Sequence, residues 1–502
     1  MKQIIVNCAY WETRVAVMEN RKLIELFVER PEEQRIVGHI YKGKVANVLP
    51  GMQAAFIDIG LEKNAFIYVD DCLPSEWKDK DDRPKPSIRE VLTQGQEILV
   101  QVVKEPLGTK GARVTTQLSF PGRYLVFMPS DPYIGLSRKI SQDGERERLR
   151  LLLKEQCKEQ EGVIVRTVAE GASEEELIAD LEFLRGLWRK TIASAKESKP
   201  MRVVHKDLDL VSRITRDVFS EDVDELIIDS QPEYHKLLED LGYFIPTLKP
   251  KLKLYTDRTG IFDSFEVEAE IEKALKRKVW LKSGGYIIID QTEAFTSIDV
   301  NTGKFTGTHQ LEETVYKTNL EATKEIARQL RLRDIGGIIL IDFIDMRKSE
   351  HRDHVWHALQ EHLKRDRTKS HLLGFTQLGL LEMTRKKVRQ NLSDVMTRPC
   401  PYCEGKGKIL SLDTVSSRIE REIKEYARST HVESILIEVH PCLADKFEGE
   451  RGEERDRIQR ETGLEIHVHR NENMHEQHHH LFVGSQQEVR RKVAMLDGKD
   501  LP

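Results

Sequence analysis

Two aspartates near the ends of apolar segments are the residues of this chain best suited to chemistry. Asp299 and Asp342 each lie near the end of an apolar, β-branched run that predicts a strand, and the segment 311–333 between them carries apolar residues at the spacing of one helix face. This order predicts a crossover with parallel strands, so both carboxylates would emerge at one edge of a sheet. Two such carboxylates repel unless a cation lies between them, and Mg²⁺ commonly uses one or two carboxylates with phosphate oxygens. The pair predicts metal-assisted hydrolysis of a phosphodiester; the alternative is that both aspartates simply end strands and open turns.

Three other polar residues accompany this pair. Asn301 lies two residues beyond the first aspartate and is expected on the same face of the strand, where its amide could orient a carboxylate or donate to a phosphate. Asp345 is expected on the face opposite Asp342 if the strand continues, as a supporting or structural group. Asp290, at the end of another apolar run, is a weaker candidate.

Cys400 and Cys403 form a second candidate metal site. Two cysteines at this spacing can place two thiolates on one Zn²⁺, and the glycines that follow, Gly405 and Gly407, let the backbone turn toward the sulfur atoms. Zinc takes four ligands and no second cysteine pair follows, so the missing ligands could come from the same motif of a second subunit. The pair predicts a zinc clamp in a homodimer, with an unmetallated redox pair as the alternative.

The elements that position these residues belong to several domains, because 502 residues correspond to roughly three to four domains. A hairpin is expected within 1–35 and a final α/β unit within 412–502. The helix 311–333 is expected to end at Gly336-Gly337 with a left-handed cap.

Short strands with glycine turns between 36 and 118 predict a small closed barrel. Its aromatic residues could stack bases inside a basic rim, as barrels that hold single-stranded nucleic acid do. These residues are Phe56, Phe66 and Tyr68, with Lys42, Lys44 and Lys110. The alternative is that Phe56 and Phe66 are ordinary core residues.

Composition limits the partners of the chain. The net charge of −5 argues against a general nucleic-acid coat, but basic clusters at 273–282, 364–369 and 385–389 flank the aspartate region and could follow a phosphate backbone, or could be solvated faces. No apolar run reaches the ~18 residues of a membrane span. The N-terminus leads directly into a strand rather than a signal peptide, which predicts a cytoplasmic protein.

These motifs together resemble those of the bacterial ribonuclease E/G family over essentially the whole chain. The segments that carry the resemblance are 297–301, 319–322, 328–337, 341–346, 379–385 and 400–407. The chain lacks the long scaffold tail of the E members, so greater similarity to the G members is expected.

The resemblance implies roles for individual residues. Asp299 and Asp342 would hold a catalytic Mg²⁺ with support from Asn301, and Cys400 and Cys403 would bind a Zn²⁺ shared between subunits. The RNA-contacting positions of the barrel would be Phe56, Phe66 and Lys110. A 5′-monophosphate sensor would consist of Arg166 and Thr167, which suit a phosphate chemically, with Gly122 and Val126 as its other wall.

The resemblance also implies a multidomain α/β and α+β architecture. The implied parts are an RNase H-like domain (1–35 and 212–274), an inserted S1-type OB-fold RNA-binding domain (36–118), a 5′-sensor region (119–211), a DNase I-like catalytic domain (275–398), a zinc knuckle (399–411) and a small C-terminal α/β dimerisation domain (412–502).

The expected function is a Mg²⁺-dependent endoribonuclease that cuts single-stranded, A/U-rich RNA in ribosomal and transfer RNA processing and messenger decay. Water would attack phosphorus in line and leave a 3′-hydroxyl and a 5′-phosphate, and a 5′-monophosphate would stimulate cleavage. The chain would act as a homodimer or a tetramer. A non-catalytic RNA-binding protein and a DNA nuclease are the alternatives.

Overall fold

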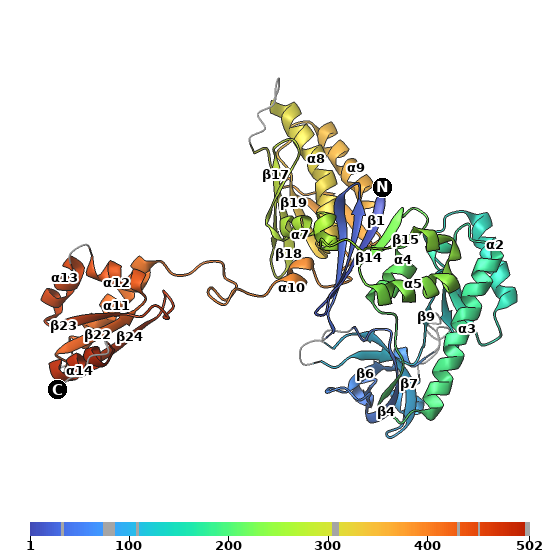
Figure 1. Cartoon of the computed structure of the whole chain (residues 1–502), viewed down its shortest axis with the longest axis horizontal. Coiled ribbons are helices and arrows are strands. Elements are labelled where there is room, and N and C mark those ends of the chain that lie inside the picture. The colour runs from blue at the N-terminus through green and yellow to red at the C-terminus, as the bar shows by residue number, and fades with distance from the viewer. Residues whose placement is uncertain are drawn as a thin grey trace. The chain divides into compact units, whose positions relative to one another are not determined.

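The computed structural model describes residues 1–31, 35–73, 86–106, 110–303, 311–428, 432–449 and 452–496. They belong to two compact units, Met1–Val395 and Met396–Pro502 (Figure 1). Among the helices of these described ranges, none combines the length and the apolar character that a membrane span requires.

The first sheet brings the N-terminus together with residues more than two hundred positions later. Its five strands lie in the order β15-β14-β1-β2-β3, with β1 antiparallel to β2 and parallel to β14. The strands are β1 (Lys2–Cys8), β2 (Thr13–Glu19), β3 (Lys22–Glu29), β14 (Glu225–Ile228) and β15 (Leu252–Leu254), and the helices that contact them are α4 (Leu210–Asp217), α5 (Gln231–Phe244), α6 (Ile261–Ser264) and α7 (Val267–Leu275). The expected N-terminal hairpin is confirmed as β2 and β3.

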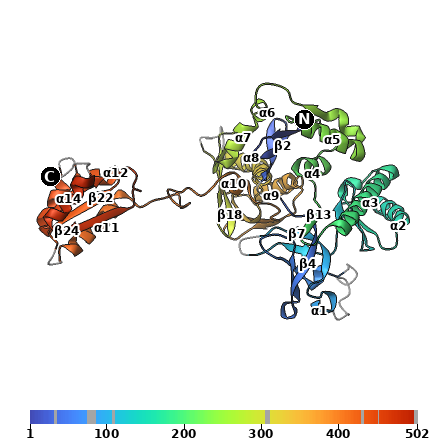
Figure 2. The same cartoon turned by 60° about the horizontal axis from the view of Figure 1, so that its bottom comes forward.

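The expected barrel is also confirmed. Five strands follow one another in the order β4-β5-β6-β8-β7, and pairing of β4 with β7 closes the ring (Figure 2). The strands are β4 (Ile40–Leu49), β5 (Ala54–Asp58), β6 (Ala65–Tyr68), β7 (Glu97–Lys104) and β8 (Arg113–Thr115), and β13 (Arg202–His205) adds to β4 on the outside, with the short α1 (Ile88–Val91) nearby.

A four-stranded sheet with two helices follows the barrel. Its order is β11-β12-β10-β9. The elements are β9 (Phe120–Pro121), β10 (Leu125–Met128), β11 (Ile134–Leu136), β12 (Gly162–Val165), α2 (Asp143–Gln156) and α3 (Glu174–Glu197). Ser173 begins α3 with a capping box, in which Ser173 Oγ accepts the Glu176 N–H and the Glu176 carboxylate accepts the Ser173 N–H.

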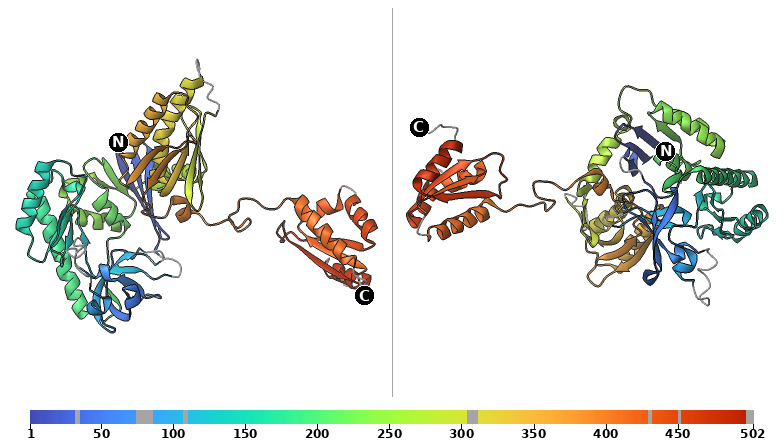
Figure 3. Two further views of the ribbon diagram at one scale, coloured as in Figure 1. Left: turned by 180° about the vertical axis from the view of Figure 1, so that it is seen from behind. Right: turned by 90° about the horizontal axis from the view of Figure 1, so that it is seen from below.

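The sheet that carries the two aspartates has six strands in the order β16-β17-β18-β19-β21-β20. Its strands are β16 (Lys278–Trp280), β17 (Tyr286–Gln291), β18 (Phe295–Asn301), β19 (Gly337–Asp342), β20 (Ser370–Phe375) and β21 (Leu381–Arg385), and its helices are α8 (Leu311–Leu332), α9 (Ser349–Leu363) and, further along, α10 (Leu392–Met396). Figure 3 shows from behind that α8 and α9 lie together on one side of these strands.

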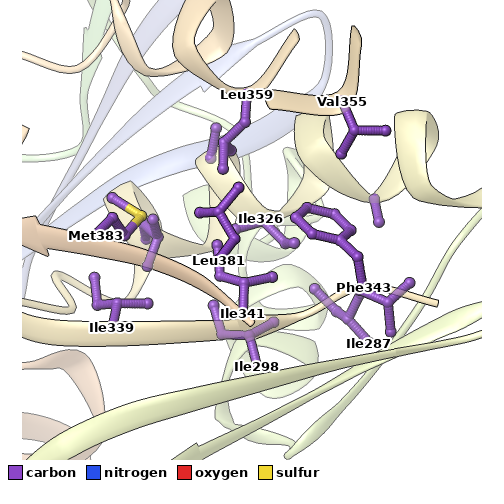
Figure 4. Close-up of a cluster of buried hydrophobic side chains, with 14 of the residues drawn as sticks. Ile287, Ile298, Ile326, Ile339, Ile341, Phe343, Val355, Leu359, Leu381 and Met383 are labelled. Atoms are coloured by element: carbon purple, nitrogen blue, oxygen red, sulfur yellow. The ribbon is translucent and has the colours of Figure 1, made fainter. Parts of the chain in front are cut away.

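The core of this region explains why one face of the sheet is apolar. Alternate side chains of the strands, among them Ile287, Ile298 and Ile341, pack against Ile326 of α8 and Leu359 of α9 (Figure 4). Each is almost fully buried, and burial of such a side chain contributes about 1.5–3 kcal/mol. The helices therefore hold the strands in a fixed register and leave the other face open.

The expected cap at Gly336-Gly337 is wrong in position. The helix α8 ends at Leu332, and the left-handed residue is Asp334, with φ of +50°. Aspartate tolerates this conformation, and here Arg385 and Arg389 hold its carboxylate. Gly336 instead lies where the backbone of Lys387 comes close, since a Cβ on Gly336 would be 2.7 Å from Lys387 Cα.

The second unit is a three-stranded sheet with helices, as expected for a small α/β domain. In the order β23-β22-β24, β22 is parallel to β23 and antiparallel to β24. The elements are α11 (Leu412–Tyr426), β22 (Ser434–Val439), α12 (Pro441–Glu448), α13 (Glu453–Thr462), β23 (Glu465–Arg470), β24 (His479–Gly484) and α14 (Gln486–Leu496).

Candidate functional site

The two aspartates lie opposite each other in one sheet. β18 and β19 are parallel, and their register pairs Asp299 directly with Asp342. Neighbouring strands lie about 4.8 Å apart and paired side chains point to the same face, so the two carboxylates are neighbours. Both side chains are exposed. The predicted crossover and the shared edge are confirmed.

Alternation of side chains along each strand exposes the aspartates. The residues on either side of each one are buried in the core beneath the sheet, and they are Ile298, Val300, Ile341 and Phe343. The aspartates consequently point to the open face, away from α8 and α9.

The electrostatics of the pair favour a cation. Burial and the negative charges of Asp299 and Asp345 raise the pKa of Asp342. The Asn301 amide donates to Asp299 Oδ2 at 2.8 Å, which fixes this carboxylate and confirms that the two side chains share a face. β19 ends at Asp342, so strand alternation does not extend to Asp345, whose charge acts on Asp342. Excess negative charge held in place by an amide is an arrangement that suits Mg²⁺.

Asp290 belongs to a different environment. In the sheet, Asp290 is paired with Ser297, which lies near the start of β18, whereas Asn301 lies at its end. Its carboxylate accepts two hydrogen bonds from Arg277, from Nε at 2.5 Å and Nη2 at 2.6 Å, and this pairing lowers the pKa of Asp290. The structure thus separates it from the Asp299–Asp342 pair.

One residue of the predicted basic clusters is not available to phosphate. The side chain of Arg385 is only 3% exposed and its Nε donates to Asp366 Oδ2 at 2.7 Å, while Nη1 donates to Asp334 Oδ1 at 3.0 Å. Arg385 of β21 therefore binds both the turn that follows α8 and the segment before β20, and the expectation that it tracks a phosphate backbone is wrong.

The aromatic residues of the barrel form an outer surface. Phe56 and Phe66 pair directly across β5 and β6, with ring centroids 5.8 Å apart, and both are half-buried. The barrel core consists of other residues such as Ile57 and Ile67, so the alternative that the two rings are ordinary core residues does not hold. Lys110 is exposed, in the segment that runs beside β6.

Two lysines of the expected rim differ from each other. Lys42 donates to the Ser198 carbonyl at 3.1 Å and pairs with Glu97 at 3.2 Å, so its charge is already engaged. Lys44, two residues further along β4, is exposed.

The four residues that the sequence predicts to form a 5′-monophosphate sensor lie within one small region. Arg166 Nη1 donates to the Gly122 carbonyl at 2.6 Å. Thr167 Oγ1 lies 2.9 Å from Ser137 Oγ. Val126 pairs in β10 with Pro121, the residue before Gly122.

Sequence reasoning missed two carboxylates that shape this region. Arg166 Nη2 donates to Asp217 Oδ1 at 2.7 Å; although burial alone would raise the pKa of Asp217, the Arg216 and Arg166 guanidinium groups lower it. The buried Asp180 accepts the backbone N–H groups of residues 123–125, and its two carboxylate oxygens lie 2.6 Å from where a Cβ on Gly122 would be. Glycine is thus required at this position, and no motif in the sequence indicated either carboxylate.

The cysteine motif forms a tight turn with backbone N–H groups directed at its sulfur atoms. Hydrogen bonds from the backbone N–H groups of Cys403 and Tyr402 lower the pKa of Cys400, and the Gly407 N–H donates to Cys403 Sγ at 3.3 Å. Glu404, Gly405 and Gly407 all have positive φ, which confirms the tight turn that the glycines predict. N–H groups directed at sulfur favour thiolates, the form that binds zinc.

In the parts of the chain that the structure describes, no group of three or more His, Cys, Asp or Glu side chains is arranged to hold a metal ion. The aspartate pair and the cysteine pair each bring two ligands. Two carboxylates fit Mg²⁺, whose other ligands are phosphate oxygens and water. Two thiolates fit half of a structural zinc site.

Comparisons with known proteins agree along most of the chain. A model described as "Ribonuclease E/G family" matches residues 119–388, and one described as "RNase E/G, Thioredoxin-like domain" matches residues 399–485. Ribonuclease G of Escherichia coli (strain K12) is 44% identical over 470 residues, which cover 93% of this chain and 96% of that protein. Ribonuclease G of Haemophilus influenzae is 45% identical over 447 residues, 88% of this chain and 91% of that protein. Ribonuclease E of E. coli is 36% identical over 495 residues, 96% of this chain but 46% of that longer protein.

Proposed function

This chain belongs to the ribonuclease E/G family and is an endoribonuclease of RNA processing, and we propose that it cuts single-stranded, A/U-rich RNA with Mg²⁺ held by Asp299 and Asp342. The observation that carries the proposal is the direct pairing of these two aspartates across β18 and β19 on an open face.

The residues around the pair have distinct proposed roles. Asp299 and Asp342 would hold the ion, and Asn301 would keep the Asp299 carboxylate turned toward it through the 2.8 Å hydrogen bond. When bound, Mg²⁺ would supply a more acidic water and would neutralise charge on the phosphate. Asp345 would add negative charge beside Asp342 and strengthen the attraction for the cation.

The barrel and the sensor would hold the RNA strand. Phe56 and Phe66 offer adjacent rings on which bases can stack, with Lys110 exposed beside them. Arg166 and Thr167, with Gly122 and Val126, would bind a 5′-monophosphate and favour the cutting-competent arrangement. Because Asp217 already pairs with Arg166, a 5′-phosphate would have to compete with this carboxylate.

The remaining assignments concern architecture. The order β15-β14-β1-β2-β3 supports an RNase H-like domain from 1–35 and 212–274, and the closed barrel supports an S1-type domain over 36–118. We assign 119–211 to the sensor, 275–398 to a DNase I-like catalytic domain, 399–411 to a zinc knuckle and 412–502 to a dimerisation domain. Cys400 and Cys403 of two subunits would share one Zn²⁺ in a homodimer, which could pair into a tetramer. The proposed targets are ribosomal and transfer RNA precursors and messenger RNA, in the cytoplasm.

The test is cleavage of one short A/U-rich RNA with Mg²⁺, carrying either a 5′-monophosphate or a 5′-hydroxyl, by the wild type and by Asp342→Asn. We expect faster cutting of the monophosphate RNA by the wild type and loss of both activities in the variant. Asp290→Asn is the matched control, because it removes a strand-end carboxylate of the same sheet that is bound to Arg277.

Each result has a separate meaning. Equal cutting of the two RNAs would leave the nuclease and refute the sensor. Cutting by Asp342→Asn at the wild-type rate would refute the metal site. Equal cutting of DNA of the same sequence would favour a less selective nuclease, and RNA binding without cutting by the wild type would favour a binding protein.

A further inference from the structure

An aromatic and basic cluster lies on the open face of the sheet that carries the aspartates. Lys278 and Trp280 lie two residues apart on the edge strand β16, and Tyr286 lies on the adjacent β17. Register pairs Trp280 with Tyr286, so both rings share a face with the lysine. We call these three residues the edge platform.

The platform is held together by contacts among its own members. Lys278 Nζ lies 3.6 Å from the centre of the Tyr286 ring and 4.0 Å from the centre of the Trp280 ring. The two rings meet edge to face, with centroids 5.4 Å apart. These cation–π contacts keep the ammonium group in place while Trp280 remains 59% exposed.

The platform is continuous with the aspartate pair. Tyr286 of β17 is paired directly with Asn301 of β18, and the register that places Lys278 beside Ile288 also places Ile288 beside Asp299. Two strand spacings therefore separate Lys278 from Asp299, which is about 10 Å. A short run of nucleotides can span this distance along one face.

Packing does not account for an indole in this position. The core of the region lies on the other face of the sheet, where Ile287 and Ile289 of β17 are buried. Within the described residues, Lys278 forms no ion pair, although the neighbouring Arg277 does so with Asp290. The open face thus presents a ring and a positive charge to solvent beside two carboxylates that need a cation.

We propose that the edge platform is a base-stacking subsite that holds the RNA strand beside the bond to be cut. A base stacks on the exposed face of Trp280, and Lys278 contacts an adjacent phosphate. Tyr286 supports both by fixing the lysine and by packing against the edge of the indole. The inference rests on the proposed function, because it takes the Asp299–Asp342 pair as the place of cleavage.

Single-stranded RNA is the occupant that this chemistry favours. Every base has a π-face, so a ring platform binds unpaired bases of any sequence, whereas the bases of a duplex are already stacked on one another. The lysine matches the negative phosphate backbone. A subsite on the β17 side of the pair would hold the substrate against the sheet itself, independently of the barrel.

The experiment compares Trp280→Ala with Trp11→Ala, which removes a comparably exposed tryptophan from the loop between β1 and β2. RNA affinity is measured without Mg²⁺, and KM and kcat are measured with it. Loss of one stacked base is expected to weaken binding by about 5- to 160-fold in Trp280→Ala, with KM raised and kcat little changed. Trp280→Phe should retain most of the affinity because it retains a ring, and Trp11→Ala should match the wild type.

Two further readouts separate a contact with RNA from a structural effect. An RNA with one abasic position near the cut should bind the wild type more weakly, but the same lesion should have no further effect in Trp280→Ala. Lys278→Ala should reduce the slope of log affinity against log salt by about 0.7, the value for one contact with single-stranded phosphate.

The outcomes distinguish this inference from the function on which it rests. If the wild type cuts RNA and Trp280→Ala binds and cuts as Trp11→Ala does, the subsite is refuted and the nuclease stands. If Trp280→Ala loses affinity but is equally sensitive to every abasic position, the effect is structural and the subsite is also refuted. If Trp280→Ala loses affinity and the abasic effect while Asp342→Asn still cuts, the subsite stands and the metal assignment fails.

Discussion

Replacing Arg385 by methionine should destabilise the sheet that carries the candidate metal site. Its guanidinium joins Asp366 of the segment before β20 to Asp334 of the turn that follows α8, and Nη1 also donates to the Ile335 carbonyl at 2.9 Å. The three charged side chains are 3%, 4% and 8% exposed for Arg385, Asp366 and Asp334. In Arg385→Met both carboxylates would lose this guanidinium while remaining buried.

The expected loss is large because the charges are removed from water. Deleting one partner of a buried ion pair destabilises a protein by about 3–5 kcal/mol. Arg389 also pairs with Asp334, at 2.6 Å, and relieves part of the loss, so we expect a value of about 3 kcal/mol. The backbone amide hydrogens of β19 and β21 that exchange only when this region opens should then exchange with solvent about a hundredfold faster.

The assay is hydrogen exchange of the intact chain, followed by mass spectrometry of peptides from β19 and β21. Lys386→Met is the matched control, since Lys386 is exposed and its loss should change stability by less than about 0.5 kcal/mol. Adding Asp334→Asn and Asp366→Asn to Arg385→Met should restore much of the protection, because no buried carboxylate is left without its partner. Wild-type exchange in Arg385→Met together with weakened RNA binding would refute the structural role and restore the phosphate contact that the sequence suggested.

Three other predictions concern the proposed metal sites. Asn301→Ala frees the Asp299 carboxylate and should lower kcat by about tenfold with RNA affinity unchanged, as expected for the loss of one hydrogen bond to a charged group. Single-turnover cleavage measures this decrease. An unchanged kcat would contradict the proposed role of Asn301 in orienting Asp299. Asp345→Asn removes a charge that raises the pKa of Asp342, so Asp342 should stay ionised to lower pH. When Mg²⁺ affinity is measured against pH, the loss of affinity on acidification should therefore occur at lower pH in this variant than in the wild type. Loss of affinity at the same pH in both proteins would contradict this coupling. Cys403→Ser should eliminate about half a zinc per chain and convert dimers to monomers in metal analysis and light scattering, and a dimer that persists without zinc would refute the clamp.

Local pattern predicted the elements around the candidate site well. The helix between the two aspartate strands, the parallel crossover and the closed barrel all follow from apolar periodicity and turn residues, which report on burial along a single segment. The face shared by Asp299 and Asn301 follows from strand alternation in the same way.

Pairings between distant segments could not be predicted in this way. Arg166 meets Asp217 across 51 positions, and Gly122 must be glycine because Asp180 of α3 approaches it. The basic run 385–389 has the composition of a phosphate contact, yet Arg385 is buried between two carboxylates supplied by other elements. Composition records that a charge is present, whereas tertiary packing decides which partner neutralises it.

This difference separates the candidate metal-binding carboxylates from a structural carboxylate of the same sheet. Asp290 and Asp299 are both strand aspartates beside buried isoleucines; the sequence ranks Asp290 lower, but it does not show what binds Asp290. Arg277 neutralises Asp290, while neither Asp299 nor Asp342 has an ion pair with any residue that the structure describes. Two unneutralised carboxylates in direct register are electrostatically unfavourable in the free protein, and a divalent cation relieves that repulsion. Introducing Ile288→Arg beside Asp299 should therefore weaken Mg²⁺ affinity and stabilise the fold, whereas a variant that bound Mg²⁺ as tightly as the wild type would show that this repulsion is not what draws the ion.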